Sequence, residues 1–99
     1  MEIQETGNNI IGKIEGRLDT ICAMSLDKDF KQLAEKADKS ITIDCSKLEY
    51  VCSSGLRLFL MLHKAACQKG GSFSLTHVND EIAKIFKITG LATLLKIQN

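Results

Sequence analysis

Two consecutive serines and a glycine precede the most apolar stretch of this chain, in the segment CSSGLRLFLML from Cys52 to Leu62. Three kinds of chemistry use such an arrangement. A serine hydroxyl can cap a helix, act as a nucleophile, or accept a modification. The choice between them depends on the residues elsewhere in the chain and on the elements that position them.

A nucleophilic serine needs a base and a group that stabilises the oxyanion. The G-x-S-x-G pattern is absent, and the two histidines, His63 and His77, lie ten and twenty-four residues after Ser53. His63 falls on the apolar side of a predicted helix, where a partly buried imidazole is expected. His77 ends a predicted strand, where we expect a surface position. No third member of a triad is visible, so the sequence does not indicate an enzyme.

Sites for phosphate loops, metals and other cofactors are not indicated either. The chain lacks G-x-x-x-x-G-K and C-x-x-C, and its cysteines, Cys22, Cys45, Cys52 and Cys67, have no zinc spacing. We therefore expect no cofactor, no metal and four free thiols, mostly as small core residues. One alternative stays open, because Cys45 and Cys52 flank a short predicted connection and could form a redox pair.

The composition is that of one soluble domain spanning residues 1–99. The net charge is +1, from 13 Lys and Arg against 12 Asp and Glu, and Trp is absent. Neither a basic stripe nor a stacking platform for nucleic acid is present. The longest apolar run, Leu58 to Leu62, is too short to span a bilayer, and the polar, acidic start is not a signal peptide. The expected location is the cytoplasm.

The first half of the chain predicts a hairpin followed by a helix. A short strand opens at Ile3, the turn Gly7–Asn9 follows, and apolar alternation predicts a second strand that ends at Gly16. Asp19 and Thr20 are both residues of the N-cap type. Apolar residues spaced by three and four then predict one helix face: Leu26, Phe30, Leu33, Ala34 and Ala37.

The second half alternates strands and helices. Strands are predicted at Ile41–Ser46 and Ser72–Val78, with a connection from Lys47 to Cys52 and an apolar helix that Gly70 and Gly71 end. Asn79 caps a third predicted helix, which Gly90 ends. For Leu91 to Ile97 both a strand and a short helix remain open. The order β-β-α-β-α-β-α predicts an α/β domain with a mixed four- to five-stranded sheet and helices packed against it.

Taken alone, the serine segment has a structural interpretation. Ser53 would be an N-cap, worth about 1 kcal/mol. Ser54 and Gly55 would allow the backbone to pass closely at a tight turn.

Three blocks in the chain nevertheless resemble the STAS domain of bacterial anti-sigma factor antagonists. The longest is IDCSKLEYVCSSGLRLFLMLHKAA, Ile43 to Ala66, which carries Asp-x-Ser at a strand end and Ser-Ser-Gly-Leu at a helix start. The others are GRLDT, Gly16 to Thr20, and IFKITGL, Ile85 to Leu91. The three blocks stand in the family's order and cover most of the chain.

The resemblance implies an STAS-like fold and a regulatory switch. By position, Ser53 falls on the serine that a partner kinase phosphorylates, Ser54 on its neighbour, and Asp19 on an acid that helps kinase recognition. In such systems the anti-sigma factor is itself the kinase, and phosphorylation breaks its complex with the antagonist. A phosphatase of the PP2C type restores that complex.

Two residues depart from the family pattern. Cys52 stands where the family usually has Asp, and Arg57 stands where Gly is common. The resemblance therefore implies five residues in partner binding or kinase recognition: Asp19, Cys52, Ser54, Gly55 and Arg57. Cys52 also supports an alternative, a non-phosphorylated STAS binding or scaffold module that could sense a ligand or oxidant through this thiol. The sequence leaves the oligomeric state open.

Overall fold

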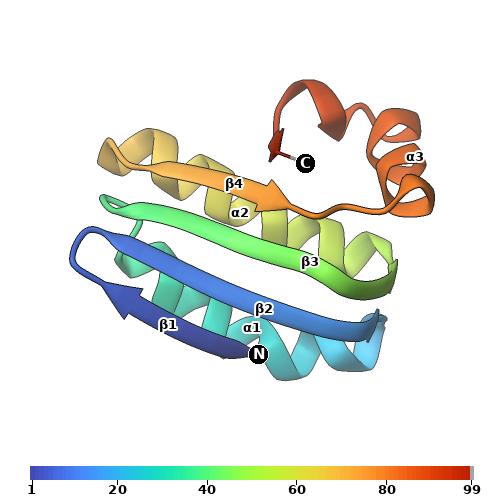
Figure 1. Cartoon of the computed structure of the whole chain (residues 1–99), viewed down its shortest axis with the longest axis horizontal. Helices are drawn as coiled ribbons and strands as arrows, with labels where there is room; N and C mark the ends of the chain where they lie inside the picture. Colours follow the sequence, from blue (N-terminus) through green and yellow to red (C-terminus); the bar gives the residue numbers. More distant parts are fainter. Residues whose placement is uncertain (99) are drawn as a thin grey trace.

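The fold is an α/β structure built on a five-stranded sheet, as a computed structural model of residues 1–98 shows (Figure 1). The strands lie in chain order, β1-β2-β3-β4-β5. The elements are β1 (Glu2–Thr6), β2 (Asn9–Leu18), α1 (Thr20–Glu35), β3 (Ser40–Val51), α2 (Ser53–Lys69), β4 (Ser72–Thr76), α3 (Asp80–Ile88), the 3₁₀ helix η1 (Leu91–Thr93) and β5 (Lys96–Gln98).

The sheet is mixed, as the sequence predicts. β1 and β2 pair antiparallel through a tight turn in which Gly7 has a φ of 57°, a conformation that glycine adopts without strain. The pairs β2–β3, β3–β4 and β4–β5 are all parallel. Parallel neighbours require crossovers, which α1 and α2 supply for the first two pairs. The carboxyl ends of β2, β3 and β4 therefore lie at one end of the sheet, where the three helices begin (Figure 1).

The core lies between the sheet and the two long helices, which cover the same face of the sheet (Figure 1). Every second residue of β2 is buried from Ile10 to Ile14, as period-two alternation predicts. Phe59 of α2 is fully buried and contacts three other aromatic rings, Phe30, Phe73 and Phe86, at centroid separations of 5.9 to 6.4 Å. This packing fixes α1, α2 and α3 relative to the sheet.

Two strand boundaries differ from the prediction. β2 does not end at Gly16: this residue adopts a φ of 76° at an irregularity in the β2–β3 register, and the strand continues to Leu18. The predicted connection from Lys47 to Cys52 is strand almost throughout, because β3 pairs with β2 as far as Val51. The polar residues in that stretch lie on the exposed side of β3 while Leu48 and Val51 are buried.

The C-terminal part holds both elements that the sequence left open, η1 followed by β5. β4 ends at Thr76, two residues earlier than expected, because His77 turns the chain with a φ of 56°. The predicted cap is confirmed: the Asn79 side chain accepts from the N–H of Ile82 at 2.9 Å. Within the described residues no helix combines the length and apolarity that crossing a membrane requires.

Candidate functional site

The first turns of α1 and α2 lie side by side at the carboxyl ends of β2 and β3. Leu18 and Val51, the last residues of those strands, are paired in the sheet. One residue on, the N–H of Cys52 donates to the carbonyl oxygen of Leu18 at 2.9 Å. The Thr20 hydroxyl lies 3.9 Å from the Cys52 sulfur. The structure thus brings together GRLDT and CSSG, two blocks that are more than thirty residues apart in sequence.

Ser53 is the first residue of α2 and not its N-cap, so the capping prediction is wrong. Cys52 holds the cap position, with φ −94° and ψ 176°, and its carbonyl oxygen accepts the first helical hydrogen bond, from the N–H of Leu56. The extended conformation belongs to Cys52 because β2 and β3 pair up to the preceding residue. Ser53 is exposed, and its hydroxyl has no hydrogen-bond partner among residues 1–98.

Gly55 is buried where the start of α2 meets the strand ends, which confirms the predicted close backbone passage. A Cβ atom placed on Gly55 would lie 2.7 Å from Leu18 Cγ and 2.9 Å from Val51 Cγ2. Contacts this short require the neighbours to move, since packed cores leave little free volume. Ser54, next to it, is half-buried. Glycine therefore sets how closely α2 approaches the sheet and where Ser53 is presented.

The Cys52 thiol is half-buried and makes no capping hydrogen bond. Burial raises its pKa, but the N–H groups of Gly55 and Ser54 and the Thr20 hydroxyl favour the thiolate, and the net pKa is lowered. Cys45 is different: burial raises its pKa to about 12. Six strand residues separate the two cysteines, roughly 20 Å of extended chain. The proposed redox pair is therefore wrong.

All four cysteines are free, as predicted, but their placement differs from the expectation of core positions. Only Cys45 is buried, and Cys67 is exposed. Cys67 lies one helical turn from His63, and its sulfur is 3.8 Å from the imidazole Nε2.

Asp19 lies beside the serine segment, but its carboxylate has a structural role. Its side chain accepts from the N–H of Cys22 at 2.9 Å and caps α1, as its residue type predicts. The residue is half-buried, and neither α1 nor α2 has an acidic residue in its first turn. The structure therefore places Asp19 near Ser53, and the Asp19 carboxylate is hydrogen-bonded to the backbone N–H of Cys22.

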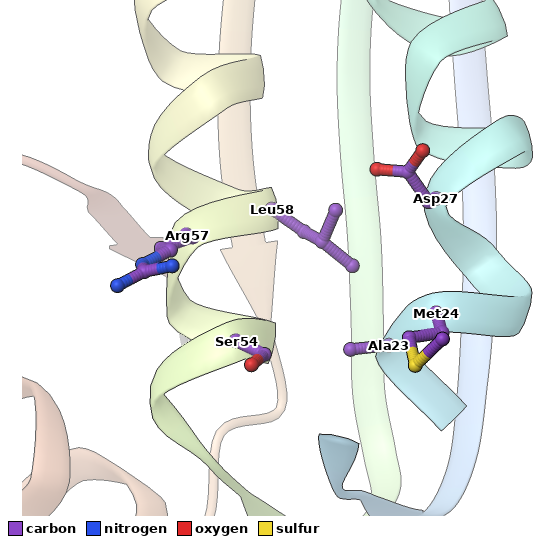
Figure 2. Close-up of a pocket in the computed structure, with 6 residues that line it drawn as sticks. All are labelled: Ala23, Met24, Asp27, Ser54, Arg57 and Leu58. Atoms are coloured by element: carbon purple, nitrogen blue, oxygen red, sulfur yellow. The ribbon is translucent and has the colours of Figure 1, made fainter. Parts of the chain in front are cut away.

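A shallow hollow of about 370 Å³ opens between α1 and α2 next to the serines (Figure 2). It is lined by Ala23, Met24, Asp27, Ser54, Arg57 and Leu58. Of these lining residues, Met24 is 74% exposed, and Ile21, which precedes it by three residues on α1, is 79% exposed. Exposed apolar side chains of this size next to a hollow are typical of a protein-binding surface.

Sequence reasoning missed Ile21 and Met24. The signal was present, because neither residue falls in register with the apolar face of α1, whose buried members are Ala23, Leu26, Phe30 and Leu33. Two exposed apolar residues one turn apart, outside the buried stripe of an amphipathic helix, form a candidate second contact surface.

Arg57 is exposed and lines this hollow and a second one of about 460 Å³ farther along α2. Its neighbours in the second hollow include Leu60, Met61 and Lys64. α2 contains no Asp or Glu, so its exposed ridge is basic. On the opposite side of the strand ends, the Arg17 guanidinium lies 4.4 Å from the ring centre of Tyr50.

The remaining titratable side chains do not assemble around Ser53. His63 is half-buried, as predicted, and His77 is exposed, with its Nδ1 3.3 Å from Asp44 Oδ1. The pKa of Asp44 is lowered, chiefly by the backbone N–H of Ser46, against the effect of burial. Within residues 1–98, no group of three His, Cys, Asp or Glu residues could hold a metal ion.

Comparison with known proteins agrees with this architecture. The anti-sigma-B factor antagonist of Bacillus subtilis is 28% identical over 97 residues, which cover 98% of this chain and 88% of that protein. Among solved structures, SpoIIAA in its unphosphorylated form superposes with a TM-score of 0.79 at 16% identity, covering 99% of this chain and 87% of that one. The phosphorylated form of the Bacillus cell fate determinant SpoIIAA superposes with a TM-score of 0.75 at 17% identity, covering 99% of this chain and 90% of that one.

The similarity to the solved structures shows the fold. The family is shown by the sequence itself. The sequence model described as "Mlab, STAS domain" matches residues 1–96. With the five-stranded mixed sheet and the Ser-Ser-Gly-Leu helix start in place, this chain belongs to the STAS domain family.

Proposed function

We propose that this protein is an anti-sigma factor antagonist whose binding to its partner is controlled by phosphorylation of Ser53. The observation that carries the proposal is the position of the Ser53 hydroxyl: it is exposed and lacks a partner among the described residues, and the next residue, Ser54, lines the hollow together with Met24 of α1. The relative from Bacillus subtilis is itself called an anti-sigma-B factor antagonist.

The partner is proposed to be an anti-sigma factor that is also a serine kinase. It would transfer the γ-phosphoryl group of its bound ATP to the Ser53 oxygen, with loss of the hydroxyl proton and release of ADP. The product carries close to two negative charges and three acceptor oxygens at neutral pH. A phosphatase of the PP2C type would hydrolyse the ester and return the free serine and inorganic phosphate.

The physical basis of the switch is desolvation at the interface. A partner docked over Ile21 and Met24 would cover Ser53 as well, since the first turns of α1 and α2 form one surface. Covering a neutral hydroxyl costs little if it finds a hydrogen bond, whereas covering a dianion without a counter-charge costs much more. The phosphate would break the complex while leaving the fold intact, because the start of a helix tolerates negative charge.

The other site residues have supporting roles in this proposal. Gly55 sets the depth of α2, Ser54 and Arg57 line the hollow that the partner would cover, and Cys52 fixes the start of the helix. Asp19 would act on kinase recognition through the α1 turn that it caps. The switch requires no catalytic residue on this chain, and it invokes no cofactor, membrane or direct nucleic acid contact. Its place of action would be the cytoplasm, where sigma factors work.

A kinase assay tests the proposal. The protein is incubated with ATP and each serine-kinase anti-sigma factor encoded in its own genome, and the product is mapped by mass spectrometry. We expect one phosphate, on Ser53, which Ser53→Ala abolishes and the neighbouring Ser54→Ala retains. Phosphate on another residue, or no phosphate with any of these kinases, would contradict the proposal.

A second candidate function is a binding or scaffold module that does not depend on phosphate. Two observations favour it: the residue before Ser53 is a thiol with a lowered pKa, and the matching family description reads "Mlab, STAS domain". In that case Ser53→Asp would leave partner binding unchanged, whereas oxidation of Cys52 would alter it. The phosphorylation switch predicts the reverse. Ser53→Asp should lose partner binding, and Cys52→Ser should retain it.

A further inference from the structure

Arg57 is a free cation one helical turn beyond Ser53. It is exposed and forms no ion pair or hydrogen bond with any of residues 1–98. Its role in packing is slight, and its positive charge is unneutralised. An unpaired guanidinium on a rigid helix is available to an anion placed within its reach.

Helix geometry places Arg57 over Ser53. Residues at i and i+4 are separated by about 40° around the axis and about 6 Å along it. Helical side chains lean toward the N-terminus of the helix, so the guanidinium of residue 57 extends over the turn that begins with residue 53. The Arg57 side chain projects from α2 at the border of the hollow between α1 and α2 (Figure 2).

The nearby carboxylates are already engaged. Asp27, which lines the same hollow, pairs with Lys31 Nζ at 2.9 Å on its own helix. Asp19 accepts from the N–H of Cys22. Arg57 therefore has no competing intramolecular partner that a phosphate would need to displace.

We propose that Arg57 binds the phosphate of phosphorylated Ser53 through a charge-assisted, bidentate pair of hydrogen bonds. The inference rests on the proposed function for the presence of the phosphate and goes beyond it by naming the group that receives it. Arg57 lines both hollows of the unmodified protein, so its capture by the phosphate also removes a basic side chain from the partner surface. Phosphorylation would then act twice, by adding negative charge and by withdrawing Arg57.

Phosphorus NMR on protein with phosphoserine installed at position 53 by genetic code expansion tests this pairing without any kinase. The pH titration of the phosphate is compared in the wild-type background, in Arg57→Ala, in Arg57→Lys and in Lys64→Ala. Lys64 is the matched control, because it is a basic residue on the same helix that lies nearly two turns farther from Ser53 than Arg57 does. Every variant retains the N–H groups at the helix start, so only the side-chain contribution differs.

Arg57→Ala is expected to raise the titration midpoint of the phosphate by about 0.2 to 0.4 pH unit, the size that an exposed pair at i and i+4 supports. Arg57→Lys should retain part of the effect, and Lys64→Ala should match the wild-type background. Equal midpoints in Arg57→Ala and Lys64→Ala would overturn the pairing. A protein that no kinase modifies at Ser53, but that shows the Arg57-dependent shift, would instead count against the proposed function alone.

Discussion

The backbone N–H of Cys52 donates to the carbonyl oxygen of Leu18 across 2.9 Å, and this bond ties the start of α2 to the end of β2. Because α1 begins one residue after Asp19, the same contact joins the first turns of both helices. The start of α2, where Ser53 lies, is therefore held next to the first turn of α1, which carries Ile21 and Met24. A change at the strand ends should therefore be transmitted to Ser53 without a direct contact.

Gly55→Ala should destabilise the protein by about 1–3 kcal/mol, the usual cost of overpacking. The added methyl would lie 2.7 to 2.9 Å from Leu18 and Val51, and the strand ends leave it no room. The higher helix propensity of alanine opposes this by about 1 kcal/mol, so the measured loss is a lower bound on the strain. Urea unfolding of Gly55→Ala against Ser54→Ala, on the same turn, checks it. A variant as stable as Ser54→Ala would show that α2 can move away from the sheet.

Two substitutions of Asp19 should separate its capping from its charge. Asp19→Ala removes the acceptor for the Cys22 N–H and should cost about 1 kcal/mol of unfolding free energy. Asp19→Asn keeps an oxygen acceptor in place and should cost much less, while it removes the negative charge beside Ser53. Because Asp19 is proposed to act through the turn that it caps, only Asp19→Ala should slow phosphorylation of Ser53 in the kinase assay. Equal slowing by both variants would show that the kinase recognises the charge instead.

Much of this arrangement follows from the sequence, and its failures have physical reasons. The alternating burial in β2 and the cap residues Asp19 and Asn79 could be predicted from the sequence, because each depends on local chemistry. The continuation of β3 to Val51 was not readable, since pairing with β2 sustains a stretch whose own residues resemble a loop. The same long-range pairing holds Cys52 extended and moves the cap one residue back from Ser53. Tertiary pairing, which sequence spacing does not encode, decided both outcomes.

The Cys52 thiol should react with iodoacetamide at lower pH than an unperturbed cysteine, whose pKa is about 8.5. Its lowered pKa depends in part on the Thr20 hydroxyl, so Thr20→Val should move the pH profile of alkylation upward. Cys45, with burial raising its pKa to about 12, should stay unmodified until the protein unfolds. Site-resolved mass spectrometry over a pH series measures alkylation of Cys52 in the wild type, of Cys52 in Thr20→Val, and of Cys45. Alkylation of Cys45 at the rate of Cys52 in the folded protein would refute the assigned environments.

Acid should weaken the protein through Glu5, which links the β1 edge of the sheet to the residues after α1. Hydrogen bonds from Lys39 and then Lys36 lower the pKa of Glu5 to about 2. Because the unfolded pKa is higher, near 4.3, this carboxylate stabilises the folded state above that pH, and its contribution is lost as the pH falls toward 2. Glu5 and Lys36 are exposed and Lys39 is half-buried, so the effect should also shrink in high salt.

Urea midpoints at pH 6 and pH 2.5 test the role of Glu5. The wild-type protein should lose more stability between these pH values than Glu5→Gln. Glu15→Gln is the control, because the ion pair of Glu15 with Lys47 is looser, at 3.7 Å, and far more exposed. A Glu5→Gln profile that parallels the wild type would show that the two lysines contribute nothing to the acid response.

A switch at Ser53 requires that the anti-sigma factor bind this protein with different affinities when serine or phosphoserine is encoded at position 53. Isothermal titration calorimetry with the serine-kinase anti-sigma factor from the same genome, without ATP, gives both dissociation constants. A phosphate dianion that is buried at the interface and only partly neutralised by Arg57 should still cost several kcal/mol, so we predict at least about a hundredfold weaker binding of the phosphoserine form. Equal affinities for the two forms would contradict a switch at Ser53.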